Sequence, residues 1–395
     1  MSDTTLRILH TADWHLGTRR GPFARFNAED DQFAAVERML TLAQEHDVQV
    51  LLVAGDVFDA QPRDLPAVTK RLAQMLAPSI KDGLHVILLP GNHDRREHFR
   101  MMRALLDLGD EASHRLVVVE KPDVVTIENV AFALVPYPTK EALAPYLEKH
   151  AGGAPHNVAL GTAYADLVRT FSQRLTQHDG PAVFCAHVTV AGVTTPSGHE
   201  LNYDSDLRLG TADLPRIDNL AYIALGHIHQ PQEISHVLPC HYSGSLDRLD
   251  WGEWRDEKQA LLVDIPTQGA TVITSLPLDV TPYYKLDLTP ADILTLTDDY
   301  TDLDRAIVKI TLTCTEDDNP LALRRTLLEL CPRCNGVDLN LPEREDELKP
   351  LVESPDNIGG TTLGYLQEQF GSDPDYDELK ALTQQFLNEL SEETA

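Results

Sequence analysis

Five segments of the sequence end an apolar run with side chains that can ligate metals. They are LRILHTADWH, VLLVAGDVFD, VILLPGNHD, AVFCAH and YIALGHIH. Carboxylates, imidazoles and one amide stand at these ends: Asp13, His15, Asp56, Asn92, His187, His227 and His229. No thiolate is among them, so the set suits manganese, iron or zinc better than a soft metal. Seven ligands, with one shared, would supply four protein ligands to each of two ions.

Two ions in such a site would carry out a defined kind of chemistry. Divalent metals about 3.5–4 Å apart hold the attacking and leaving oxygens of an in-line displacement at phosphorus. Each motif alone has a simpler explanation, because Asp-x-His and Gly-Asp are common turn sequences. A single histidine is also more often a core or surface residue than a ligand. Taken together at five matching strand ends, the motifs predict a two-metal site.

The elements that must position these side chains can be predicted from the apolar pattern. From residue 6 to about residue 278, short runs rich in Val, Ile and Leu alternate with helical patterns, such as the face of Phe33, Val36, Leu40 and Ala43. This alternation predicts an α/β domain with strands buried on both faces. Neighbouring apolar runs, such as VVTI and VAFALV, predict mixed sheets with an antiparallel portion. In open α/β sheets, sites form beyond the carboxyl ends of the strands.

The last part of the chain differs in composition. Residues 281–395 hold 9 Lys and Arg against 25 Asp and Glu. YYKLDL, IVKITLTC, LALRRTLLEL and VDLNL predict a small β-β-α-β unit, and a Pro- and charge-rich link follows. The tail then predicts an amphipathic helix whose apolar face contains Leu379, Leu382, Phe386 and Leu390. We therefore predict three parts, 1–280, 281–342 and 343–395.

Composition limits the class of protein. Hydrophobic content of 42% and charged content of 24% are ordinary for a soluble globular protein. Five cysteines make no disulfide framework, and Cys331 and Cys334 lack the second pair that a structural zinc site needs. The start has no signal-peptide pattern, and no apolar run approaches the ~20 residues of a membrane span. We expect a cytoplasmic protein that does not cross a membrane.

Net charge bears on nucleic-acid binding. The value of −29 argues against a nucleic-acid partner, because phosphates repel an acidic surface. The charge is unevenly distributed, however: residues 1–105 carry a net charge of −1 and the remaining residues carry −28. Two divalent ions opposed by only two ligand carboxylates, Asp13 and Asp56, would keep the pocket positive. Salt would screen the distant acidic surface beyond ~8–10 Å.

Five motifs follow one another in the chain: Asp13-x-His15, Gly55-Asp56, Gly91-Asn92-His93-Asp94, His187 and Gly226-His227-x-His229. In this order they resemble the calcineurin-like metallophosphoesterase superfamily. Within it, HTADWHLG, AGDVFD, PGNHD, GHIHQPQ and YSGSLDRLDWGE are similar to the SbcD family, the nuclease subunits of bacterial SbcCD complexes. The similarity covers essentially the whole chain, most firmly residues 5–255. It implies an α/β fold, a four-layer α-β-β-α sandwich with a small α+β capping domain and a C-terminal helical tail.

The resemblance also assigns roles to residues. It gives one ion to Asp13, His15, Asp56 and His229, and the other to Asp56, Asn92, His187 and His227. Asp56 would bridge the ions, which the family implies to be manganese. His93 would face the phosphate, stabilising the transition state or protonating the leaving oxygen, and Asp94 would hold its imidazole. Asp59 replaces a histidine that in some family members is thought to place the DNA strand, which leaves that role unassigned.

Arginines cluster after the first three motifs. They are Arg19, Arg20, Arg25, Arg63, Arg95 and Arg96. Because they belong to loops at the site end of the sheet, we predict contacts to DNA phosphates. For any one of them, the alternative is a solubilising surface position.

The resemblance implies a DNA double-strand exonuclease and single-strand or hairpin endonuclease, associated with the nucleoid. The chain has no Gly-rich phosphate loop, so an ATP-driven step needs a partner, implied to be an SbcC-like ABC ATPase bound by the tail. The helices containing Leu65, Val68 and Leu72, and Phe99, Met102 and Leu105, are implied to form a homodimer. From the sequence pattern alone, packing within their own domain is the default interpretation of these helices.

Two other functions remain open. The first is a small-molecule or protein phosphoesterase on the same fold, which would need neither a capping domain nor a docking tail. The second is a degenerate scaffold that only binds, against which the intact ligand set and His93 argue.

Overall fold

The computed structural model describes residues 6–18, 26, 29–62, 64–106, 114–150, 156–194, 207–341, 362–367 and 376–393. Four of the predicted phosphate-contact residues, Arg19, Arg20, Arg25 and Arg63, lie outside the described residues, as does most of the predicted link. The chain divides into two compact units, residues 1–313 with 318–339, and residues 314–317 with 340–395. All seven predicted metal ligands belong to the larger unit.

The first sheet of the larger unit has six strands. Four parallel strands follow one another across it: β1 (Leu6–Thr11), β2 (Val50–Val53), β3 (His85–Leu88) and β4 (Leu116–Val118). Antiparallel β13 (Gln259–Ile265) pairs with β1, and β14 (Val272–Pro277) forms the edge. Every residue of β2 is buried, because its apolar run is covered on both faces. The predicted mixed sheet is thus confirmed.

The second sheet also has six strands. Its order is β11 (Gln232–Glu233), β12 (Cys240–Tyr242), β10 (Leu220–Gly226), β7 (Ala182–His187), β6 (Val130–Val135) and β5 (Asp123–Ile127). The four central strands are parallel and the two edge strands are antiparallel. Short β8 (Thr189–Val190) and β9 (Arg208–Leu209) form a separate pair.

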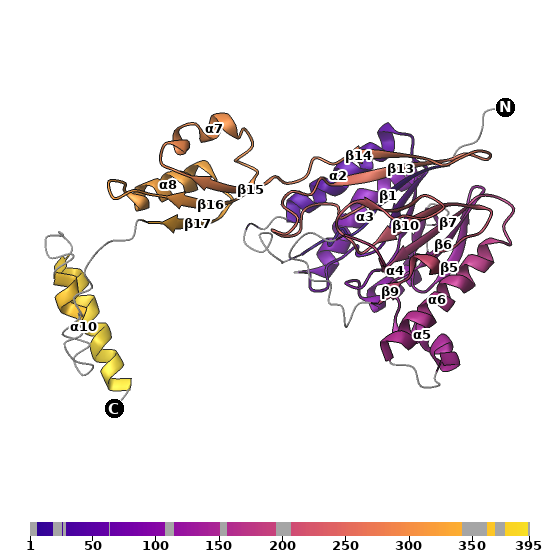
Figure 1. Cartoon of the computed structure of the whole chain (residues 1–395), viewed down its shortest axis with the longest axis horizontal. Coiled ribbons are helices and arrows are strands. Elements are labelled where there is room, and N and C mark those ends of the chain that lie inside the picture. Colours follow the sequence, from indigo (N-terminus) through magenta and orange to yellow (C-terminus); the bar gives the residue numbers. More distant parts are fainter. Residues whose placement is uncertain are drawn as a thin grey trace. The chain divides into compact units, whose positions relative to one another are not determined.

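The sheets face each other and helices cover their outer faces (Figure 1). Over the first sheet lie α2 (Glu29–Glu45), α3 (Leu65–Lys81) and α4 (Arg96–Leu106). Over the second lie α5 (Lys140–Leu147) and α6 (His156–Leu175). One apolar cluster between the sheets joins Ile8, Leu52 and Ile87 to Phe132 and Tyr222. These layers are the predicted α-β-β-α sandwich.

The apolar faces of α3 and α4 are largely covered by their own domain. Val68, Leu72 and Phe99 are buried in the core of the first sheet. The default interpretation, packing within the domain, therefore holds for these three side chains, because an amphipathic helix lying on a sheet buries its apolar face there. On α4, Met101 and Leu105 are instead 54% and 64% exposed.

The predicted β-β-α-β unit is present. It consists of β15 (Tyr283–Leu288), β16 (Ile307–Thr313), α8 (Pro320–Leu330) and β17 (Cys334–Asn340), with α7 (Leu296–Asp299) after β15. Three-residue 3₁₀ helices occur at Glu148–His150, Thr211–Asp213 and Asp292–Leu294. Cys331 and Cys334 are buried free thiols, as expected. The predicted domain boundary at residue 280 falls between β14 and β15. Both strands belong to the larger unit, so this boundary stays a prediction.

The smaller unit contains α10 (Tyr376–Glu393), the helix predicted for the tail. Its apolar side chains Leu379, Leu382 and Phe386 are 39%, 59% and 60% exposed. In this unit the apolar face of the helix is therefore open to solvent.

Candidate metal centre

The loops that follow β1 and β2 continue side by side beyond the strand ends. The Asp13 amide donates to the Gly55 carbonyl at 2.9 Å, and the His15 amide donates to the Asp56 carbonyl at 2.9 Å. The parallel pairing of the two strands thus extends into the loops. As a result, Asp13 and Asp56 emerge at the same edge of the first sheet.

The backbone at several ligand positions has an unusual conformation. Six described non-glycine residues have positive φ: Asp13, His15, Asp47, Asp56, Glu128 and His227. Four of the six are predicted ligands, with φ of 52°, 46°, 49° and 97° for Asp13, His15, Asp56 and His227. Such backbone costs of order 1–3 kcal/mol at each residue and concentrates at functional sites. The fold therefore holds strained backbone in order to aim these side chains.

Two motif glycines allow the loops to approach one another closely. A Cβ atom on Gly91 would lie 2.0 Å from the Asp56 Oδ1 atom, and one on Gly226 would lie 2.0 Å from the Ala54 carbonyl oxygen. Both contacts are shorter than any side chain tolerates. The glycines of GNHD and GHIH are thus needed for packing between loops, as well as for a turn.

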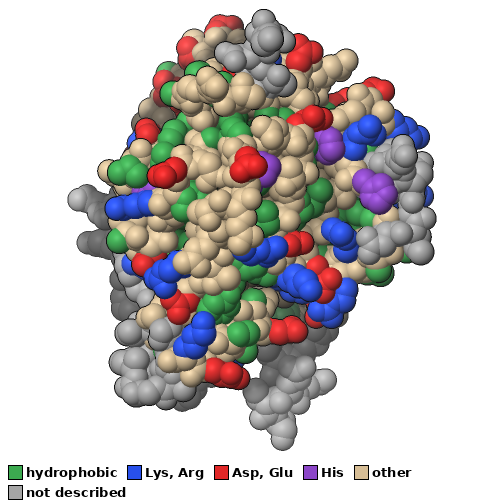
Figure 2. Space-filling view, turned by 90° about the vertical axis from the view of Figure 1, so that its right-hand side faces the viewer, with side chains coloured by type: hydrophobic (Ala, Val, Ile, Leu, Met, Phe, Trp, Pro, Cys, Tyr) green, Lys and Arg blue, Asp and Glu red, His purple; other side chains and the backbone are tan. Residues whose placement is uncertain are grey.

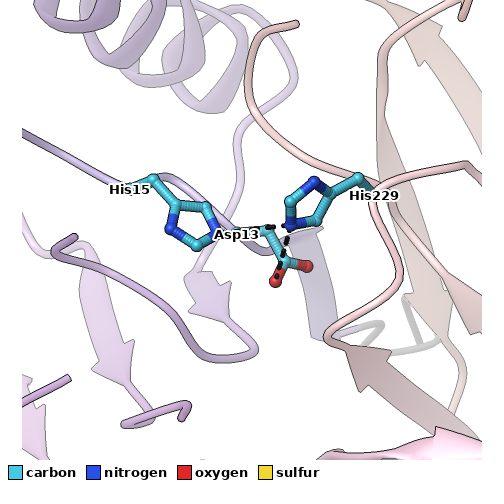
Figure 3. Close-up of side chains that lie close together, drawn as sticks. All are labelled: Asp13, His15 and His229. Carbon is cyan, nitrogen blue, oxygen red and sulfur yellow. Dashed lines mark hydrogen bonds and ion pairs between the residues drawn. The ribbon is translucent and has the colours of Figure 1, made fainter. Parts of the chain in front are cut away.

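One group of ligands comes from the two sheets together (Figure 3). Asp13 and His15 follow β1, and His229 follows β10. The His229 Nε2 atom lies 4.0 Å from Asp13 Oδ1 and 3.2 Å from His15 Nε2. One ligand atom from each residue lies within 4.8 Å of the others, a spacing that fits one ion.

A second group lies beside it. Asp56, His187 and His227 also place ligand atoms within 4.8 Å of one another. The Asn92 Oδ1 atom joins this group, at 3.0 Å from His187 Nε2 and 2.9 Å from His227 Nδ1. The second group thus contains an amide, a carboxylate and two imidazoles.

Asp56 lies between the two groups. Its Oδ2 atom is 3.5 Å from His15 Nε2 and 3.4 Å from His187 Nε2, so one carboxylate reaches histidines of both. All donors are oxygen or imidazole nitrogen, the ligands that hard and borderline divalent ions prefer. The structure therefore brings together all seven predicted ligands in an arrangement that fits two divalent ions with Asp56 between them.

Hydrogen bonds on the far side of the imidazoles orient two of these histidines. The His187 Nδ1 atom lies 2.9 Å from the Ala54 carbonyl, and His229 Nδ1 lies 2.7 Å from Glu253 Oε1. Such partners favour the proton on Nδ1 and direct Nε2 at the metal. Asp59 is buried near His15, with its Oδ2 atom 3.9 Å from His15 Nδ1, which is beyond hydrogen-bond distance.

Glu253 is a functional residue that the sequence patterns did not reveal. It ends the segment YSGSLDRLDWGE, which pointed to the family but gave no role to the glutamate. Only the tertiary contact between Glu253 and His229 reveals a role for the glutamate.

His93 lies at the mouth of the centre. Its ring centroid is 4.7 Å from that of His15, and its backbone amide donates to Asp56 Oδ1 at 2.8 Å. Its side chain is half-buried, and neighbouring Asn92 is exposed. A substrate can therefore reach both residues from solvent.

Asp94 accepts hydrogen bonds from the backbone of two loops. Its Oδ2 atom accepts hydrogen bonds from the amides of Val57 at 3.0 Å and Gly91 at 2.9 Å, and its Oδ1 atom accepts one from Phe58 at 2.8 Å. These contacts join the GNHD loop to the loop after β2. Asp94 thus holds the loop that carries His93, and its predicted support of the His93 imidazole stays a prediction.

Burial and neighbouring charges together determine how the ligands titrate. Burial raises the pKa of Asp13 to about 6. Burial alone would lower the pKa of His187, but the charges of Asp56 and Asp13 outweigh it and raise that pKa to about 9. Burial and nearby His187 lower the pKa of His227 to about 3. Metal binding therefore competes with protonation of His187.

Two of the predicted phosphate-contact arginines lie in the described residues. Arg95 is exposed, and its guanidinium donates to the Ala60 carbonyl at 3.3 Å. Arg96 is partly buried and donates to the carbonyls of Glu120, at 3.1 Å, and Tyr137. Arg96 therefore connects the loop after β4 to the loop after β6, a structural role that competes with phosphate binding.

The chain matches known proteins over most of its length. The model of the calcineurin-like phosphoesterase family matches residues 6–231. The SbcD component of the nuclease SbcCD from Bacillus subtilis is 25% identical over 284 residues, covering 67% of this chain and 68% of that protein. The corresponding SbcD component from Escherichia coli K12 is 27% identical over 294 residues, covering 70% and 69%.

A third relative is the DNA double-strand break repair protein Mre11 of Aeropyrum pernix. It is 27% identical over 296 residues, covering 72% of this chain and 64% of that protein. These similarities confirm the predicted resemblance to SbcD nucleases and the prediction of a phosphodiester hydrolase. With its sandwich fold and its paired clusters of metal ligands, the chain belongs to the calcineurin-like phosphoesterase family.

Proposed function

We propose that the chain is a manganese-dependent DNA nuclease that degrades duplex ends and cuts single strands and hairpins. One observation carries the proposal: six further ligands converge around Asp56, with Asn92 exposed and His93 half-buried beside them. The relatives that match most of the chain are named as nucleases or as a DNA repair protein. DNA is therefore the substrate that these relatives favour.

The residues of the centre would divide the work. Asp13, His15, Asp56 and His229 would hold one ion, and Asp56, Asn92, His187 and His227 the other. When bound, two divalent ions lower the energy of an in-line displacement by neutralising charge on the attacking and leaving oxygens. His93, anchored through its backbone amide, would stabilise the transition state or protonate the leaving oxygen. Asp94 would keep the loop of His93 in place.

Surface charge is compatible with a DNA substrate. Basic and acidic side chains are interspersed on the face shown in Figure 2. Arg95 is exposed close to His93 in the chain, and we propose it as a phosphate contact. The low net charge of residues 1–105 makes this part of the chain less repulsive to DNA than the acidic remainder.

We further propose two protein partners. The exposed apolar face of α10 would dock on an SbcC-like ABC ATPase, and residues 281–342 would form a capping domain. Met101 and Leu105 of α4 would contribute to a homodimer contact. Such a complex would act on the nucleoid in the cytoplasm. None of the helices in the described ranges is long and apolar enough to cross a membrane.

A paired-substrate assay tests the proposed function. The purified full chain with Mn²⁺ would be given labelled duplex and hairpin DNA, and separately bis-p-nitrophenyl phosphate. We expect hydrolysis of both kinds of substrate. Hydrolysis of the small diester with intact DNA would instead indicate a small-molecule phosphoesterase. Failure to hydrolyse either would support a scaffold that only binds.

A further inference from the structure

A buried ion pair lies directly behind the metal centre. Glu253 is fully buried and Lys258 is 2% exposed, with the lysine Nζ atom 2.7 Å from Glu253 Oε2. The other carboxylate oxygen, Oε1, lies 2.7 Å from the Nδ1 atom of His229. Neither charged residue takes part in the mechanism proposed above.

The pair holds both the side chain and the backbone of His229. Besides Glu253, the Lys258 Nζ atom donates to the His229 carbonyl at 3.0 Å and to Asp256 Oδ2 at 3.3 Å. An ammonium group has three protons, and three acceptors surround this one. The Glu253 Oε2 atom also accepts from the Ser245 hydroxyl at 3.2 Å. The network is thus fully hydrogen-bonded and attached to one metal ligand.

Stability alone does not account for such a pair. Taking two charges out of water is unfavourable, and a buried ion pair replaced by apolar residues of similar size often leaves a protein equally stable. A carboxylate offers a property that an apolar residue lacks, because it accepts hydrogen bonds without donating any. Facing Glu253, His229 must therefore carry its proton on Nδ1, which leaves the Nε2 lone pair directed at Asp13 and His15.

The two metal groups differ in the acceptor that their histidine Nδ1 atoms face. In the second group, the His187 Nδ1 atom meets the neutral carbonyl of Ala54. In the first group, the His229 Nδ1 atom meets a charged carboxylate that has its own buried counterion. The first group is thus supported by a network that substitution of two side chains can alter, without touching any residue of the second group.

We propose that Glu253 and Lys258 are positioning residues that select the tautomer of His229 and thereby set the metal affinity of the Asp13–His15–His229 group. Together with the Leu249 amide at 3.3 Å and the Ser245 hydroxyl at 3.2 Å, Lys258 keeps the acceptor atom of residue 253 on the side away from His229. The proposal rests on the metal centre and holds whether the substrate is DNA or another phosphodiester.

The variant Glu253→Gln should reverse the tautomer of His229. Because Lys258 still needs an acceptor, the glutamine amide oxygen faces Lys258 and its NH₂ group faces His229. That donor requires a bare Nδ1 on His229, which places the proton on Nε2, where the ion must bind. Removing the lysine as well, in Glu253→Gln/Lys258→Met, takes away the charged donor and leaves the longer, neutral contacts of the Leu249 amide and the Ser245 hydroxyl. The amide oxygen can then turn to His229 and restore the original tautomer.

The experiment measures Mn²⁺ binding to the full chain by titration calorimetry. In Glu253→Gln we expect one of the two sites to weaken roughly 10- to 100-fold while the other is unchanged. In the double variant we expect affinity close to that of the original chain. Asp264→Asn is the matched control, because it removes a different 2.7 Å ion pair, with Arg7, on β13, the strand that begins directly after Lys258. It should leave both sites unchanged.

A second readout separates positioning from a structural role. Nitrogen-15 NMR of the metal-free protein, labelled at histidine, should show His229 protonated on Nδ1 in the original chain and on Nε2 in Glu253→Gln. Unchanged affinity and tautomer in Glu253→Gln would overturn the proposal, and so would equal weakening of both sites. If Glu253→Gln does not fold, the double variant decides: a folded protein that lacks one site contradicts the proposal, and one that binds two ions supports it.

Discussion

The backbone amide of His93 donates a hydrogen bond to the carboxylate of Asp56 at 2.8 Å, so the residue that faces the substrate is anchored to the carboxylate between the two metal groups. The anchor belongs to the backbone and leaves the imidazole available. A mutation of His93 can therefore remove the imidazole while the backbone anchor to Asp56 stays in place.

His93→Ala should keep both metal ions and lose catalysis. Alanine retains the backbone amide that contacts Asp56, but it removes the imidazole, which as a general acid contributes typically about 10²- to 10⁴-fold. The measurements are metal content by elemental analysis and the rate of DNA cleavage with Mn²⁺. His178→Ala, a half-buried histidine outside the centre, is the control and should be fully active. Metal loss in His93→Ala would contradict the assigned role.

Gly226→Ala should destabilise the protein markedly. The added Cβ atom would lie 2.0 Å from the backbone oxygen of Ala54, which cannot move without separating the two sheets. Overpacking of this kind costs typically about 1–3 kcal/mol, or more when backbone must shift. Chemical denaturation measures the free energy of unfolding. Gly336→Ala is the matched control, since a Cβ there meets nothing within 4 Å, and an equal loss in both variants would refute the steric explanation.

Metal affinity should rise with pH between about 6 and 9. In the metal-free protein the pKa of His187 is raised to about 9, so this ligand carries a proton at neutral pH that the ion must displace. Affinity should change by up to about tenfold per pH unit for each proton displaced. Calorimetry in two buffers of different ionisation enthalpy measures the protons released. Binding that releases none at pH 7.5 would show that His187 is neutral there.

Deleting residues 343–395 should separate catalysis from assembly. All seven ligands lie in the larger unit, so hydrolysis of bis-p-nitrophenyl phosphate should be unchanged. The deletion removes α10 with its exposed Leu382 and Phe386, so binding of the ATPase partner should be lost. Co-purification with the partner measures this. As a milder variant, Leu382→Asp/Phe386→Asp should have the same effect, and continued co-purification of both variants would refute the docking role of α10.

Much of the centre could be predicted from sequence because its ligands follow strands. An apolar run that ends in a polar motif is a local pattern, and neighbouring parallel strands bring their carboxyl ends to one edge of a sheet. Asp13, Asp56 and Asn92 follow adjacent strands of the first sheet, and His187 and His227 follow adjacent strands of the second. Sequence order was thus enough to predict that these side chains meet.

The contacts that the sequence did not reveal all join different elements. Phe99 lies on an amphipathic helix, and the pattern does not say whether its apolar face meets the domain or a partner. Asp94 follows His93 in sequence, yet its oxygens contact amides 37 and 36 residues away, at Val57 and Phe58. Arg96 similarly contacts the carbonyl of Tyr137, 41 residues away.

The sequence by itself determined the identity of the ligands, the alternation of strands and helices, and the kind of chemistry. The tertiary structure alone decided which groups support the ligands. Glu253 reaches His229 only because the segment after β12 passes behind the centre before the chain enters β13. Hydrogen bonds between distant segments depend on ångström-scale packing of whole layers, and no local periodicity in the chain encodes that packing.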